Sequence, residues 1–385
     1  MNYSIKKINL AYYILLLGLY LSIFLPIIRG LFRKINPSVE IIVQVVAQSL
    51  IYFPPILIFF FINLNNLRTF FIIIILIYIC LVQFFTPYFL VSDFFFGIKN
   101  YFGSLLYIPI VHYLIINYQN FNIKIEKHIK IIFIIAVSII LFETIAPDSL
   151  NNLFRSLAYN DQFTRSLGIM LNVHHQGLIL GMAVIYYFIN KRFFLMILTL
   201  ILLILSNVKT WTIALAITAV LYFIKNILKI KIKIIFLILI LAVGLFLFYL
   251  IGFFDGVISH YIGAFGAKSY SIDLMTSLWL KTIDIMSDSL IPIGFFSQAE
   301  QTGYGGYFEY MTYADVFYLL LILETGVIGA FLYFLIVYYP LLKKNKYSPI
   351  VFLSLFSMLH TNPLIVPGIL IMVTYFGYYY KYHKF

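Results

Sequence analysis

Residues 313–329 read YADVFYLLLILETGVIG, and apolar residues continue from there to position 340. A stretch of this kind is long enough to cross the hydrocarbon core of a bilayer, which needs about 20 apolar residues. Similar stretches recur along the chain, which is 63% hydrophobic and only 10% charged. Soluble domains carry about 25% charged residues. The chain therefore has more apolar surface than a soluble core can bury, and we predict a polytopic membrane protein.

The apolar stretches also predict the type of secondary structure. Backbone groups in lipid must be satisfied within the protein, which leaves helices or a closed barrel. The stretches are about 17 to 25 residues long, which suits helices and not short barrel strands. We predict an all-α protein with one integral membrane domain over residues 1–385 and about 12 transmembrane helices. The predicted spans are 10–28, 39–62, 69–91, 101–117, 129–147, 172–189, 193–207, 210–226, 233–252, 313–340, 348–361 and 363–380.

The basic residues predict the orientation. Twelve spans place both termini on one side, and most of the 26 lysines and arginines then fall on that same side. The positive-inside rule makes this side cytoplasmic. The formal net charge of +12 is therefore a topology signal with the lipid bilayer as its partner, and we predict no nucleic-acid partner. The first external connection is an exception, because it contains Arg29, Arg33 and Lys34.

Residues 253–312 form the longest polar interruption, an external loop between the ninth and tenth spans. Within it, residues 271–290 have the spacing of an amphipathic helix that carries Trp279. Tyr304 and Tyr307 follow in a glycine-rich segment. Tyrosines combine apolar faces with hydroxyl donors, so these residues predict either a glycan-binding surface or an aromatic belt at the membrane interface.

The connection between the fifth and sixth spans is unusually rich in hydrogen-bonding side chains. It contains Arg155, Arg165, Asn172, His174 and His175. The guanidinium group suits bidentate recognition of phosphate, and a histidine or asparagine can orient a hydroxyl group. The alternative is an ordinary polar turn whose long side chains snorkel to the interface.

Four further charged residues are candidates. Lys209 begins the eighth span on the external side, where it would bind an anion at a helix N-terminus or anchor the helix at the interface. Asp315 lies at the external mouth of its span and could act as a base or orient a hydroxyl group. Glu324 lies deeper, beside Gly326 and Gly329, which would allow close helix packing. Glu143 is a candidate partner for an arginine. We predict structural roles for both glutamates.

Cofactor motifs are absent from the sequence. His174 and His175 are adjacent and therefore do not share a helix face, as a pair of zinc ligands would. There is no glycine-rich phosphate loop of the nucleotide-binding kind. Cys80 is the single cysteine, so no internal disulfide can form. We predict no metal and no other cofactor.

Several short motifs, in this order, give the chain a resemblance to a known family. They are Arg165-Ser-Leu-Gly168 with Asn172 and Gly177, Ser206 to Thr210, Trp279 to Gly294, and Asp315 to Gly329. In order and topology the chain resembles the O-antigen polymerase (Wzy) and O-antigen ligase superfamily. Ligases usually have His-Asn where this chain has Asp315-Val316, and this departure favours a polymerase.

The resemblance implies a glycosyltransferase that uses a polyprenyl-diphosphate-linked glycan as donor. Such a polymerase acts in the bacterial inner membrane, in the synthesis of lipopolysaccharide O-antigen or capsule. It transfers the growing glycan from undecaprenyl diphosphate to the incoming lipid-linked oligosaccharide. A chain-length regulator and a flippase are implied partners. The alternatives are a ligase that passes polymer to lipid A-core or another acceptor, and a flippase or secondary transporter, for which twelve spans are also suitable.

Overall fold

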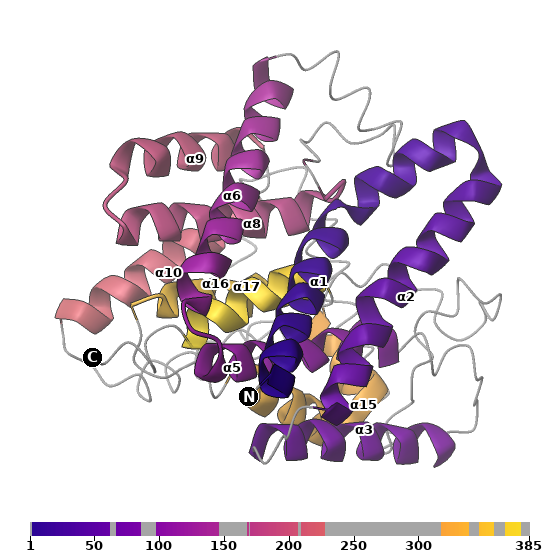
Figure 1. Ribbon diagram of the computed structural model, residues 1–385. Helices are drawn as coiled ribbons and strands as arrows, with labels where there is room; N and C mark the ends of the chain where they lie inside the picture. Colours follow the sequence, from indigo (N-terminus) through magenta and orange to yellow (C-terminus); the bar gives the residue numbers. More distant parts are fainter. Residues whose placement is uncertain are drawn as a thin grey trace, which may run out of the picture.

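The computed structural model describes residues 2–61, 67–85, 98–145, 168, 170–206, 209–227, 317–338, 346–357 and 366–378. Within these ranges every regular element is a helix (Figure 1). The elements are α1 (Asn2–Ile35), α2 (Pro37–Phe61), α3 (Leu67–Phe85), the π-helix η1 (Ile98–Phe102), the 3₁₀-helix η2 (Gly103–Leu106), α5 (Tyr107–Asn117), α6 (Phe121–Ile145), α8 (Val173–Ile189), α9 (Phe193–Leu205), α10 (Lys209–Ile227), α15 (Phe317–Val337), α16 (Ser348–Ser357) and α17 (Pro367–Tyr378).

Three of these helices are long and apolar enough to cross a membrane, at Lys6–Ile35, Pro37–Phe59 and Phe121–Ile145. Several shorter apolar helices accompany them, α9 and α17 among them. The helical fold class is confirmed, and a membrane protein is supported. The number of twelve spans stays a prediction, because the ninth span (233–252) lies outside the described residues.

The helices pack as two antiparallel hairpins on either side of α16 and α17. α1 and α2 form one hairpin, and α8 and α9 form the other (Figure 1). α17 lies between them and contacts α1, α5 and α16, while α8 contacts α6, α10 and α16. α3 packs against α15 on one side of this arrangement. α8 is therefore the element through which α6, α9, α10 and α16 are brought together.

Small residues and hydroxyl groups hold the helices together, as expected in a membrane protein. Gly368 of α17 lies directly against α1, and its backbone N–H donates to the Ser22 hydroxyl oxygen over 2.8 Å. In α2, Pro55 has no N–H to donate to the carbonyl of Ile51 one turn earlier. The buried Tyr107 hydroxyl of α5 donates to that carbonyl over 2.6 Å. A helix–helix contact thus supplies the hydrogen bond that the proline removes.

Candidate active site

The carboxylate of Glu143 is the first component of the candidate site. It lies near the C-terminal end of α6 and is only 1% exposed. The backbone N–H of Gly168 donates to its two oxygens over 3.2 and 3.4 Å. Gly168 has φ = 62°, in the left-handed region that favours glycine. This hydrogen bond joins the end of α6 to the turn that precedes α8.

The N-terminus of α8 is the second component. Asn172 is its N-cap, and the side-chain oxygen accepts the backbone N–H groups of His174 and His175 over 2.9 and 3.1 Å. Both histidine side chains are half-buried in the first turn. The first turn of a helix carries a partial positive charge that attracts anions. Asn172 therefore has a structural role as the N-cap, and its predicted role in positioning the glycan stays a prediction.

Gln176 and Trp211 form the third component, and sequence reasoning missed both. Gln176 is 1% exposed, and neither polar atom of its amide has a hydrogen-bond partner among the described residues. Its side chain lies against Gly168, beside the Glu143 carboxylate. The indole N–H of Trp211, on α10, is likewise buried and unpartnered within the described ranges, and its ring packs on Gly177. The available signal was Gln176 itself, a polar residue near the start of an apolar span, since polar residues within spans usually have a function.

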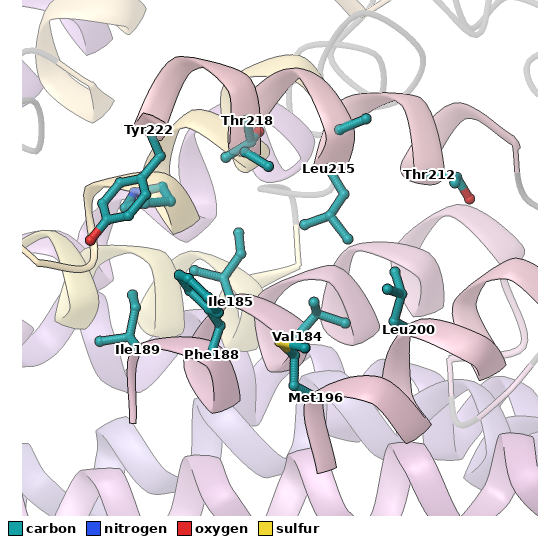
Figure 2. A pocket seen from close by; sticks show the side chains of 13 residues that line it. Val184, Ile185, Phe188, Ile189, Met196, Leu200, Thr212, Leu215, Thr218 and Tyr222 are labelled. Carbon is teal, nitrogen blue, oxygen red and sulfur yellow. The ribbon is translucent and has the colours of Figure 1, made fainter. Parts of the chain in front are cut away.

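An apolar cavity of about 530 Å³ lies between α8, α9 and α10, and none of these polar groups is among the residues that line it. Figure 2 shows side chains of α8 and α10 facing one another across it, with Tyr222 at one end and Thr212 at the other. The Thr218 hydroxyl in its wall donates to the Ala214 carbonyl of the same helix, so it does not require a ligand. Thr212 directly follows Trp211 in α10. Trp211 itself does not line the cavity, because its ring packs on Gly177.

α15, which packs against α3, contains a break. Gly326 has φ = 70° and ψ = 173°, so the helix is kinked directly after Glu324 and Thr325. The Tyr78 hydroxyl of α3 donates to the carbonyl of Thr325 over 2.9 Å. Gly329 lies against the Thr325 side chain and the Tyr78 ring, which leaves no room for a larger residue. Close packing is thus confirmed for Gly329, whereas Gly326 produces the kink.

The other predicted site residues are only partly placed. Lys209 is the first residue of α10, and Glu324 lies within α15, but the structure does not describe their side chains. The whole loop 253–312 with its predicted amphipathic helix lies outside the described residues. The remaining candidates also lie outside them, namely Arg155, Arg165, Trp279, Tyr304, Tyr307 and Asp315. Their roles stay predictions.

Comparison with known proteins places this arrangement in context. The sequence model of the O-antigen ligase family (Wzy_C) matches residues 194–334, which include α10 and most of α9 and α15. The resemblance to the O-antigen polymerase and ligase superfamily is confirmed. No curated protein and no solved structure matches the chain with significant similarity.

Members of this superfamily are glycosyltransferase-like enzymes, which implies a lipid-linked glycan substrate and a membrane context. The matched region contains Trp211 and the whole α10 wall of the cavity. Glu143, Gly168 and Gln176 lie N-terminal to it. A flippase or transporter is not favoured by this match.

Proposed function

We propose that the protein is the polymerase of a lipid-linked surface polysaccharide of the O-antigen or capsule type. It transfers the growing glycan from undecaprenyl diphosphate to an incoming repeat unit at the outer face of the inner membrane. Both termini lie in the cytoplasm in this proposal, and a chain-length regulator and a flippase act with the enzyme. The observation that carries the proposal is a pair of buried polar groups, Gln176 and Trp211, that have no partner among the described residues, in a chain whose residues 194–334 match the O-antigen ligase family.

The proposed substrate has a polar part and an apolar part, and so do the groups and the cavity described above. A lipid-linked glycan has sugar hydroxyls and a diphosphate at one end and a hydrocarbon chain at the other. Thr212 to Tyr222 covers about 15 Å of helix, at 1.5 Å per residue. This is about half of the roughly 30 Å hydrocarbon core. The cavity could therefore accept hydrocarbon over about one leaflet, with hydroxyl groups bound near Gln176 and Trp211.

The proposed reaction is a displacement at the first sugar carbon of the growing glycan. The bond from that carbon to the diphosphate oxygen breaks, and a bond to a hydroxyl oxygen of the incoming repeat unit forms. Arg165, Arg155 and Lys209 would neutralise the departing diphosphate. Asp315, with His174 or His175 as the next candidates, would take the hydroxyl proton.

The remaining candidates would position the substrate and support the site. Asn172, Trp279, Tyr304 and Tyr307 would hold the glycan. Glu143 and Glu324 are proposed as structural carboxylates. The hydrogen bond between Gly168 and Glu143 supports this for Glu143, because it fixes the turn before α8.

A ligase is the second candidate function. The matching family model carries the description O-antigen ligase, and the chemistry would be the same with a different acceptor. Asp315-Val316 stands where ligases usually have His-Asn, so we rank the polymerase first.

Reconstitution in vesicles separates the two. The purified protein would be supplied with one lipid-linked repeat unit as both donor and acceptor. A polymerase converts it into a ladder of longer products, and Arg165→Ala should lower the rate by at least about tenfold, which corresponds to roughly 1.4 kcal/mol of transition-state stabilisation. A ligase makes no ladder and transfers glycan only after a lipid A-core acceptor is added. The second result would overturn the polymerase assignment.

A further inference from the structure

The amide of Gln176 presents a hydrogen-bond donor and an acceptor side by side in a buried position. Only 1% of the residue is exposed, and neither Nε2 nor Oε1 has a hydrogen-bond partner among the described residues. Nε2 carries two N–H groups, and Oε1 accepts up to two hydrogen bonds. Leaving both atoms unpaired lowers the stability of the fold, so a molecule that pairs with both binds favourably here.

A second unpaired donor approaches α8 next to this residue. Trp211 of α10 is fully buried, and its indole N–H has no partner in the part of the chain that the structure describes. A Cβ atom added to Gly177, the residue directly after Gln176, would lie 2.6 Å from Nε1 of the indole. The lack of a side chain at Gly177 is therefore what allows the N–H edge of the indole to lie against α8 at this point.

The turn before α8 covers the Gln176 amide. The side chain of Gln176 lies against Gly168, and Gly168 and Leu171 have φ values of 62° and 45°. The left-handed region is unfavourable for leucine, and residues held in it cluster at binding and catalytic sites. Displacement of this short turn would open a route to the amide from the N-terminal end of α8.

Two adjacent hydroxyl groups of a sugar match these polar atoms. One hydroxyl donates to Oε1 while its neighbour accepts from Nε2, so that both hydrogen bonds stay close to linear. Glutamine pairs in the same way with the adjacent donor and acceptor of adenine. The hydroxyl that accepts from Nε2 has a second lone pair, which suits the indole N–H of Trp211. A single hydroxyl cannot lie in line with both Nε2 and Oε1, and hydrogen bonds weaken steeply as their angle closes.

We propose that Gln176 recognises two adjacent hydroxyl groups on the first sugar of the lipid-linked glycan, and that the indole N–H of Trp211 donates to one of them. The inference rests on the proposed function, because it takes a lipid-linked glycan as the ligand. Lys209, the predicted diphosphate ligand, begins α10 two residues before Trp211. The sugar bound at Gln176 is therefore the one that is joined to the diphosphate.

Binding of single-sugar lipids to the full chain in nanodiscs tests the inference. The probes are undecaprenyl diphosphates that carry glucose or galactose, together with the 2-, 3- and 4-deoxy analogue of each. The Kd of each probe follows from the rise in Tm with ligand concentration. Gln176→Leu is the main variant, and Trp211→Phe is the second, because it removes only the indole donor and part of the ring. Gln44→Leu is the matched control, the same substitution at a half-buried position of α2.

We expect deoxygenation at two adjacent positions of one parent sugar to weaken binding to the wild type and to Gln44→Leu by about tenfold each. In Gln176→Leu the parent and deoxy lipids should bind within about twofold of one another, and Trp211→Phe should lose the dependence on one of the two positions.

The inference is overturned if neither parent lipid binds, if the sensitive positions are not adjacent, or if Gln176→Leu keeps the wild-type dependence. An ordered water would then complete the amide. Failure of the proposed function has a different signature, because a protein that shows the expected binding preference but makes no ladder from a lipid-linked repeat unit would contradict only the polymerase assignment.

Discussion

Gln176 and Trp211 are costly residues in the folded protein. A buried polar group without a hydrogen bond costs about 1–3 kcal/mol of stability. Both are almost completely buried. Neither the amide of Gln176 nor the indole N–H of Trp211 is paired within the described ranges. A catalytic role or a bound molecule that completes the hydrogen bonds is among the explanations for groups of this kind. Their position beside Glu143 and the start of α8 therefore assigns them to the candidate site.

Replacing Gln176 by leucine should separate stability from activity. The substitution removes an unpaired amide and keeps a side chain of similar size, so Tm should stay the same or rise. The rate of glycan elongation should fall about tenfold, which corresponds to one lost hydrogen bond of about 1.4 kcal/mol. Thermal unfolding and product ladders measure the two effects. Unchanged elongation by a stable Gln176→Leu protein would remove this residue from the site.

The sequence identified the polar start of α8 but not its inner residues. Asn172, His174 and His175 are conspicuous because they interrupt apolar sequence at the mouth of a span. Gln176 follows directly, but its burial depends on the turn at Gly168 and on α6. Such long-range contacts leave no local pattern in the sequence.

At the scale of the element, α15 also has a feature that depends on a long-range contact and that the sequence does not predict. The sequence predicts one span over 313–340, and the structure describes a helix over part of it, with a kink at Gly326. A glycine in an apolar helix is compatible with either close packing or a break. What stabilises the break is the Tyr78 hydroxyl, which donates to Thr325 from a helix 247 positions away. Discontinuous helices expose backbone groups, and in transporters such helices line substrate sites.

Gly326→Ala should destabilise the protein by about 1–3 kcal/mol, because its φ of 70° and ψ of 173° lie in a backbone region that essentially only glycine adopts. Val327 is 61% exposed and lies directly after the kink. Val327→Ala is therefore the matched control and should change stability by no more than about 0.5 kcal/mol. Chemical denaturation in detergent measures both. Equal stabilities for the two variants would contradict the role of Gly326 in the kink.

At the scale of the whole molecule, hydropathy predicted the fold well. Every predicted span except the ninth overlaps a described helix, because about 20 apolar residues form a strong local signal. The boundaries differ: α1 begins at Asn2 and ends at Ile35, whereas the first span was predicted over 10–28. Hydropathy marks the lipid-buried part of a helix and not its ends.

The predicted orientation can be tested at two exposed turns. Ser38 lies at the α1–α2 corner, and Lys191 lies in the turn between α8 and α9 with φ = 57°. Cysteines introduced at these positions into a Cys80→Ser protein should differ in labelling by an impermeant maleimide in intact spheroplasts. We expect labelling of Ser38→Cys and protection of Lys191→Cys, because the positive-inside rule places residue 191 in the cytoplasm. The reverse pattern would invert the topology and move the proposed site to the cytoplasmic face.

The most direct test of the central claim is the length distribution of the surface glycan after deletion of the gene in its host. A polymerase deletion should leave glycans of a single repeat unit on gel electrophoresis. Complementation with the wild type should restore the ladder, and complementation with Arg165→Ala should not. Normal long-chain glycan on the surface of the deletion strain would contradict the claim, as would long polymer stranded on the lipid carrier, which is the result expected for a ligase.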